Sequence, residues 1–225
     1  MDIIEKAYQA GRTTLSEYES KKVLAAYGIP VTKEEQVQDV EGLLAACKRI
    51  GYPLVLKASS AQIAHKTEKG LVRVDIRGDS EARSAFDAIM AGMDVPEKAV
   101  LVQEMVPGQR ELVVGLTRDP QFGPCVMFGL GGIFTEILED VAFRVAPLSA
   151  QDAVDLMEEI RGKKILGAVR NMAPVNREAL AGILQAVGRI GLENDTVKEI
   201  DINPLKIRNG QPVAVDALIV LSGGK

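Results

Sequence analysis

The 225-residue chain contains little of what several protein classes require. It has no tryptophan, two cysteines and one histidine, and aromatic residues make up 4% of it. Cys47 and Cys125 cannot build a disulfide framework, and they lack the C-x-x-C spacing of a zinc site. So few aromatic side chains leave little material for stacking on nucleic-acid bases or for a membrane-interface belt. We expect both cysteines to be reduced core residues.

Two further absences concern charge and long apolar runs. The 27 basic and 31 acidic side chains give a formal net charge of −4, so the chain lacks the positive surface that a phosphate backbone attracts. No uninterrupted apolar stretch approaches the roughly 18 residues of a membrane-spanning helix. The first residues include acids and show no basic region followed by an apolar run, unlike a secretory signal. We therefore expect a soluble, cytoplasmic protein that binds neither nucleic acid nor a membrane.

Helix and strand signals are mixed without a regular βαβ rhythm. Capping residues and terminal glycines predict helices at 15–27, 40–50, 81–91, 150–161 and 177–190. Short β-rich runs predict strands at 53–58, 71–76, 100–105, 111–117, 124–128, 199–202 and 212–220. Hairpin-like connections favour largely antiparallel sheets in an α+β fold with two lobes. The polar stretch 93–98 marks the expected boundary, between an N-terminal lobe of residues 1–94 and a C-terminal lobe of residues 95–225.

Oxygen-bearing side chains converge near the C-terminus. Asn209-Gly210 between two strand patterns is a strong signal for a two-residue hairpin, whose register, counted back, places Asn203 opposite Asp216. Asp201 shares their face because side chains alternate along a strand. Two carboxylates and an amide oxygen suit a hard cation such as Mg²⁺. The alternative interpretation is a solvated polar face on an edge hairpin.

A lysine and the single histidine form a second group of candidates. Lys57 ends an apolar strand pattern, so its ammonium either reaches solvent or meets an anion, because an unpaired buried ammonium is costly. His65 follows in a polar loop beside Lys66. A neutral imidazole is a competent nucleophile or proton shuttle, and the neighbouring lysine favours a phosphorylated form. An exposed loop histidine without a role is the alternative.

Three further segments carry weaker signals. The glycine-rich run 129–132 fits neither the Walker A pattern nor G-x-G-x-x-G, although its glycines allow a backbone to approach a ligand. Arg144 is a cation within an apolar strand pattern. Glu104 ends a strand just before a turn at Val106, and Glu111 opens the next strand. A strand end that offers a carboxylate and free backbone groups suits the edge of a purine and a ribose. A packing role is the alternative for each segment.

Six motifs in order resemble the ATP-grasp fold, specifically the β subunits of ADP-forming acetyl-CoA (acyl-CoA) synthetases. They are L-x-x-Y-G-I-P-V at 24–31, Y-P-L-V-L-K at 52–57, H-K-T-E at 65–68, V-Q-E-M-V at 102–106, G-L-G-G-I-F-T-E at 129–136 and E-I-D-I-N-P-L at 199–205. The resemblance runs over residues 14–220. It implies two α+β lobes with largely antiparallel sheets and a nucleotide between them.

The resemblance also implies how the nucleotide is bound. Lys57 would contact the phosphates of ATP or ADP, Glu104 and the Val106 backbone would contact adenine, and Glu111 would lie near the ribose. Asn203 would hold Mg²⁺ together with the partner aspartate of the hairpin, Asp216.

For catalysis, the resemblance matches His65 to a histidine that is transiently phosphorylated. Metal and cations would stabilise the in-line transfer of the phosphoryl group. The candidate catalytic residues are His65, Lys66, Asp201 and Arg144.

The implied reaction is acyl-CoA + ADP + phosphate ⇌ carboxylic acid + CoA + ATP. The chain shows nothing like a CoA-binding or ligase domain, so we expect an α subunit to carry them in an α2β2 hetero-oligomer. Two alternatives stay open. One is another ATP-grasp carboxylate ligase without phosphohistidine, and the other is a non-catalytic nucleotide-binding regulatory module.

Overall fold

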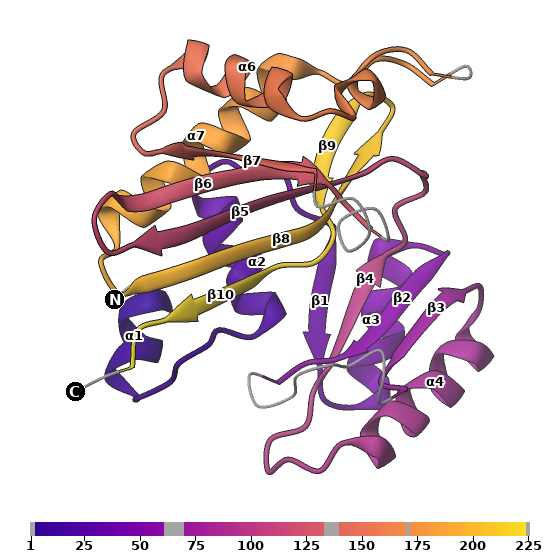
Figure 1. Ribbon diagram of the computed structural model, residues 1–225. Helices are drawn as coiled ribbons and strands as arrows, with labels where there is room; N and C mark the ends of the chain where they lie inside the picture. The colour runs from indigo at the N-terminus through magenta and orange to yellow at the C-terminus, as the bar shows by residue number, and fades with distance from the viewer. Residues whose placement is uncertain (1–2, 61–69, 133–139, 170–171, 224–225) are drawn as a thin grey trace. The chain divides into compact units, whose positions relative to one another are not determined.

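The computed structural model describes residues 3–60, 70–132, 140–169 and 172–223. The chain divides into two compact units, drawn in Figure 1. The larger unit comprises Met1–Leu15, Glu19–Val31 and Pro107–Lys225, and the smaller comprises Ser16–Tyr18 and Thr32–Val106.

The smaller unit is a four-stranded sheet in the order β1-β4-β2-β3, with every strand pair antiparallel. Its elements in chain order are β1 (Glu34–Val37), α3 (Val40–Ile50), β2 (Leu54–Ala58), β3 (Val72–Ile76), α4 (Asp79–Gly92) and β4 (Val100–Glu104). Apolar side chains of α3 and α4 form one core with the central strands. All five residues of β2 are buried, and Leu54, Leu56 and Ala58 belong to this core.

The ends of α3 illustrate why the local sequence folds this way. The Asp39 carboxylate accepts a hydrogen bond from the Gly42 amide at 2.7 Å, which satisfies one of the free amides of the first turn. At the other end, Gly51 adopts φ +87°, and its amide donates to the Cys47 carbonyl at 2.9 Å. Glycine accepts this conformation without steric cost, so the helix ends where the sequence predicts.

The larger unit is built on a sheet in the order β10-β8-β5-β6-β7, with β9 paired to β8. Its elements are α1 (Ile3–Gln9), α2 (Glu17–Ala26), β5 (Glu111–Asp119), β6 (Gly123–Leu130), β7 (Val141–Val145), α6 (Ala150–Glu159), the 3-10 helix η1 (Lys163–Leu166), α7 (Arg177–Glu193), β8 (Val197–Arg208), β9 (Gln211–Ala214) and β10 (Leu218–Leu221). Helices α6 and α7 pack against the β5-β6-β7 side of the sheet (Figure 1). Their apolar faces share one core with the strands.

The predicted α+β class with antiparallel sheets is confirmed, and all five predicted helices are present, α3 with its predicted ends and the other four with shifted ends. The sequence patterns missed α1, β1 and the short η1. Strand β1 reads Glu-Glu-Gln-Val and has no β-branched alternation, so its pairing with β4 depends on backbone hydrogen bonds.

The division into units differs from the boundary expected after residue 94. Strand β4 pairs with both β1 and β2, which places the chain as far as Val106 in the smaller unit. The N-terminal segment with α1 and most of α2 belongs to the larger unit, because Leu15 and Leu24 are buried in its core.

The structure describes both cysteines and the lengths of the helices. Cys47 is buried and its burial raises the pKa of the thiol, but Cys125 is only half-buried. The prediction of two core cysteines is therefore wrong for Cys125, which lies on β6, where alternate residues face away from the core. In the described part of the chain, every helix is too short or too polar to span a bilayer.

Candidate functional site

Lys57 is buried within β2 and meets a carboxylate. Its Nζ lies 2.7 Å from Oε1 of Glu17, and the two side chains are only 9% and 2% exposed. Two charges this well hidden from water must be paired, because either one alone carries a large desolvation penalty. The sequence left two alternatives for Lys57, contact with solvent or with an anion, and within the smaller unit Lys57 meets the anion Glu17.

Glu17 is a residue that the sequence patterns did not assign to the site. It is the first residue of α2 and is 4% exposed. A carboxylate at a helix N-terminus is favoured by the helix dipole. The missed signal is its spacing: Glu17, Lys21 and Leu24 fall at positions i, i+4 and i+7, so polar residues occupy a face that should be apolar.

Glu104 ends β4 and is fixed by backbone contacts. Its Oε1 accepts a hydrogen bond from the Lys33 amide at 3.0 Å, and its own amide donates to the Lys33 carbonyl at 2.9 Å. Val106 follows in the chain with 4% of its side chain exposed. The geometry therefore holds the strand end in place, and contact of Glu104 and Val106 with adenine stays a prediction.

Glu111 opens β5 in the larger unit and packs against the glycine-rich run. A Cβ on Gly132 would lie 2.6 Å from Oε2 of Glu111, and one on Gly131 would lie 2.7 Å from the Leu112 carbonyl. Only glycine permits this approach. Glu111 also pairs with Lys206 at 3.2 Å, so its carboxylate already has a positive neighbour.

The two-residue hairpin at Asn209-Gly210 is confirmed, with Arg208 opposite Gln211. Strand β9 is shorter than predicted, however. Pairing of β8 with β9 ends at Leu205 and Ala214, so the expected continuous strand 212–220 is wrong. Pro204, next along β8, has no amide hydrogen to donate to a ladder.

Pairing resumes at Asp201, which lies opposite Leu218 of β10. Three residues separate the two paired stretches on either side, namely 202–204 and 215–217. Because the two gaps are equally long, the two paired stretches share one register, and the middle residues of the gaps are Asn203 and Asp216. The ladders therefore keep the predicted alignment of these two residues, and their binding of a metal stays a prediction.

Asp201 lies in an acidic environment. Burial, followed by the negative charges of Glu199 and Asp216, raises the pKa of Asp201 to about 6. No group of three His, Cys, Asp or Glu side chains with metal-binding geometry occurs among the described residues. The candidate donors are thus two carboxylates and the Asn203 amide oxygen, a set that leaves positions open for phosphate and water, as Mg²⁺ prefers.

The other predicted catalytic residues lie elsewhere. Arg144 is on the edge strand β7, and its guanidinium forms an ion pair with Glu159 of α6. This ion pair therefore links Arg144 on the strand to a residue of the helix. His65 and Lys66 lie outside the described residues.

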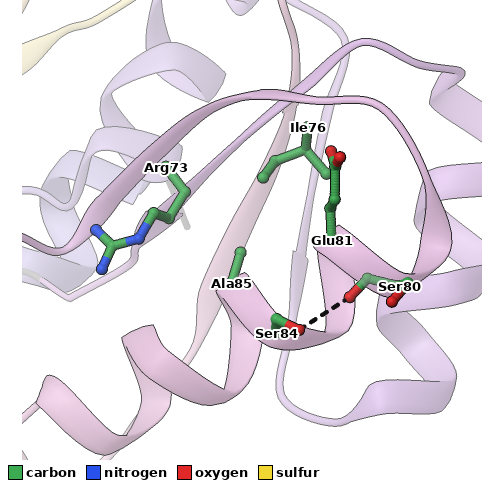
Figure 2. Close-up of a pocket in the computed structure, with 6 residues that line it drawn as sticks. All are labelled: Arg73, Ile76, Ser80, Glu81, Ser84 and Ala85. Carbon is green, nitrogen blue, oxygen red and sulfur yellow. Dashed lines mark hydrogen bonds between the residues drawn. The ribbon is translucent and has the colours of Figure 1, made fainter.

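A surface pocket in the smaller unit contains none of the predicted site residues. Figure 2 shows it between β3 and α4, where the Ser84 hydroxyl donates to the Ser80 carbonyl at 3.1 Å. Its lining residues are Arg73, Ile76, Ser80, Glu81, Ser84 and Ala85. One cation and one carboxylate on an open surface do not make a ligand site.

Comparison with known proteins decides the family. The family model for the ATP-grasp domain matches residues 6–221. The chain is 46% identical to the acetate–CoA ligase (ADP-forming) I subunit beta of Pyrococcus furiosus, over 98% of this chain and 97% of that one. It belongs to the ATP-grasp family of ADP-forming acetate–CoA ligase β subunits. The predicted resemblance, fold and class of enzyme, a ligase, are therefore confirmed.

Two other relatives of this ATP-grasp chain are informative. It is 37% identical to the acetate–CoA ligase (ADP-forming) I of Archaeoglobus fulgidus, over 98% of this chain but 33% of that longer one. It is 43% identical to an acetyl-coenzyme A synthetase of Ca. Korarchaeum cryptofilum, with a TM-score of 0.88 and coverage of 98% and 99%. That structure contains coenzyme A and Mg-AMPPCP, and its phosphohistidine segment points towards the nucleotide-binding site.

Proposed function

We propose that this chain is the nucleotide-binding, phosphoryl-transferring subunit of an ADP-forming acyl-CoA synthetase. It takes part in the reaction acyl-CoA + ADP + phosphate ⇌ carboxylic acid + CoA + ATP. Similarity to a β subunit of nearly the same length supports the reaction. The observation that carries the proposal on this chain is the alignment of Asn203 with Asp216 beside Asp201, since such an acidic set calls for a cation.

The proposed nucleotide contacts are those that the family resemblance implies. Lys57 supplies a buried positive charge for the phosphates, while Glu104 and the Val106 backbone hold adenine and Glu111 holds the ribose. Asn203 and Asp216 would hold Mg²⁺, whose charge would neutralise the transferring phosphoryl group. The donor chemistry of these residues fits that ion, and the Korarchaeum structure binds Mg-AMPPCP.

The phosphoryl group passes through His65 in this proposal. A neutral imidazole nitrogen attacks the γ-phosphorus of ATP, the bond from phosphorus to the ADP oxygen breaks, and an N–P bond forms. The reverse step makes ATP from ADP. Lys66 is the cation beside the phosphohistidine, and Asp201 is a carboxylate beside the metal ligands. Arg144 contributes a positive charge, and its guanidinium also forms an ion pair with Glu159.

A separate α subunit completes the enzyme. The longer Archaeoglobus relative carries a β-like region as one third of a single chain, which supports a need for the remaining two thirds. We propose that the α subunit supplies the CoA-binding and ligase domains in a cytoplasmic α2β2 assembly.

Reconstitution tests this function. The purified chain should bind Mg-ADP but make no ATP from acetyl-CoA, ADP and phosphate until the co-purified α subunit is added. ATP formation by the chain alone would contradict the proposal, as would a complex that forms but makes no ATP. In the second case, ATP-driven transfer to an amine without histidine labelling would indicate another carboxylate ligase, and magnesium-dependent binding alone would indicate a regulatory module.

A further inference from the structure

Helix α2 carries polar side chains on its buried side. Ser20 is 0% exposed and Lys21 is 1% exposed, and Lys21 is among the largest fully buried side chains of the chain. Burying an ammonium is costly unless its hydrogen bonds are made inside the protein. A leucine or methionine would fill the same space at lower cost, so the buried lysine points to a specific task.

Both residues contact the segment that carries Asp216. The Nζ of Lys21 donates to the Val215 carbonyl at 3.2 Å, and the hydroxyl of Ser20 accepts a hydrogen bond from the Ile219 amide at 3.2 Å. Asp216 lies between these two contact points. The helix therefore holds the chain on both sides of the proposed metal ligand.

The held segment has no strand pairing of its own. Residues 215–217 lie between β9 and β10. The Val215 amide donates to the Pro204 carbonyl at 3.1 Å, and the Ala217 amide donates to Oδ1 of Asp216 at 2.9 Å. Without a ladder, the position of Asp216 depends on such individual contacts, and two of them come from α2.

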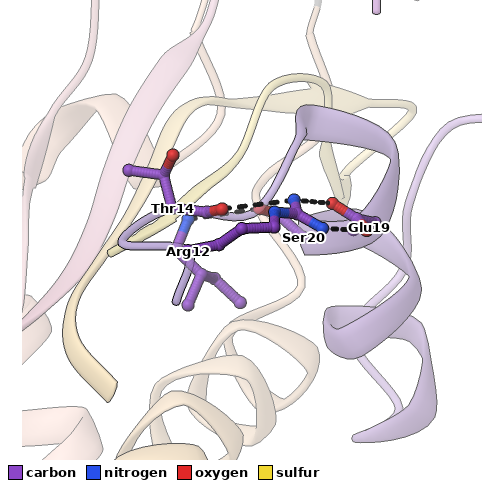
Figure 3. Close-up of polar contacts among 5 residues, drawn as sticks. Arg12, Thr14, Glu19 and Ser20 are labelled. Carbon is purple, nitrogen blue, oxygen red and sulfur yellow. Dashed lines mark hydrogen bonds and ion pairs between the residues drawn. The ribbon is translucent and has the colours of Figure 1, made fainter. Parts of the chain in front are cut away.

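Helix α2 is itself fixed next to β10. The guanidinium of Arg12 donates to the Thr14 carbonyl at 3.2 Å and to the Glu19 carboxylate at 2.9 Å, which ties the preceding turn to the helix (Figure 3). The Leu15 amide donates to the Ile219 carbonyl at 3.0 Å. A helix anchored in this way can serve as a rigid support.

We propose that Lys21 and Ser20 are positioning residues that hold residues 215–219 so that Asp216 meets a divalent cation in the correct place. The proposal rests on the proposed function, because it requires a metal site at Asn203 and Asp216. Groups that orient metal ligands commonly change metal affinity by about 10- to 100-fold when they are removed.

The test compares two variants and one control by calorimetry of ADP binding, with Mg²⁺ and with a chelator. Lys21→Met should lower the magnesium-dependent ADP affinity by about 10-fold or more. Binding without metal should stay unchanged, a split that general damage to the fold would not produce. Lys21→Arg keeps a cationic donor and should recover part of the lost affinity. Lys22→Met, at the exposed neighbouring lysine, should behave as the wild type.

A second variant keeps the proposal open to refutation if Lys21→Met does not fold. Ser20→Ala removes a single hydrogen bond from the same segment and should weaken magnesium-dependent binding several-fold. The inference would be overturned if Lys21→Met folds and shows the same metal dependence as the wild type. If Lys21→Met does not fold, the same result in Ser20→Ala would overturn it. If the wild type shows no metal dependence, or Asp216→Asn changes nothing, the proposed metal site itself fails.

Discussion

The two units treat their buried charges in opposite ways. In the smaller unit, Lys57 and Glu17 form an ion pair of 2.7 Å that is closed to water. In the larger unit, burial, followed by the like charges of Glu199 and Asp216, raises the pKa of Asp201 to about 6. The first group brings opposite charges together, whereas the second brings like charges together, which a cation would stabilise. This difference separates a closed ion pair from an acidic group at which we propose that a metal binds.

The largest expected effect comes from breaking the buried pair. Lys57→Met should lower nucleotide affinity by about 100-fold and destabilise the protein by about 3–5 kcal/mol, because it leaves the Glu17 carboxylate buried without its cation. Calorimetry and urea unfolding measure the two effects.

The matched control for this variant is the double substitution Lys57→Met with Glu17→Gln. It removes both charges, so it should recover much of the lost stability and none of the lost nucleotide affinity. Recovery of both would show that Lys57 acts only as a structural partner of Glu17.

The next effect concerns the acidic site. Asp216→Asn should weaken magnesium-dependent nucleotide binding by about 10- to 100-fold with the fold intact, since one anionic ligand is lost. Glu193→Gln, at the last residue of α7, is the charge-matched control. Equal magnesium dependence in Asp216→Asn and the wild type would reduce the site to a solvated hairpin face.

A smaller effect should appear in the pH dependence of the metal-free protein. The pKa of Asp201 is raised from 3.8 to about 6 in the folded state. The folded state therefore binds more protons than the unfolded state in this range, and stability falls as pH rises from about 4 to 6. Asp201→Asn removes this cost, so it should exceed the wild type by about 1–3 kcal/mol above pH 6 and match it near pH 4.

Urea unfolding with a chelator, at several pH values, measures that difference. Added Mg²⁺ should shrink it, because the cation offsets the same repulsion. An Asp201→Asn variant that is less stable than the wild type at pH 8 without metal would contradict the destabilisation of ionised Asp201 by burial and like charges.

Local signals predicted the parts of this molecule that depend on neighbouring residues. The Asn209-Gly210 turn fixes the hairpin register, and from that register the alignment of Asn203 with Asp216 follows. Helix caps such as Asp39 likewise act within one turn. The sequence patterns did not predict the strand break at 215–217. The strand breaks there because Pro204 cannot donate a ladder hydrogen bond, and this loss outweighs the strand propensity of the surrounding residues.

Distant contacts account for what the sequence patterns could not supply. Glu17 and Lys57 are 40 positions apart, and Lys21 and Val215 are 194 positions apart. A polar residue on an apolar helix face indicates that a partner exists without indicating which one. The roles of Glu17 and Lys21 therefore emerged only from the packed structure.

The proposed reaction passes a phosphoryl group through His65. The complex with the α subunit should take up an acid-labile label from ATP labelled at the γ-phosphate in the presence of Mg²⁺, and the label should map to His65. His65→Asn should remain unlabelled while it binds ATP with wild-type affinity, because the chain has no other histidine. An unlabelled wild-type complex, or a label that persists in His65→Asn, would contradict the account.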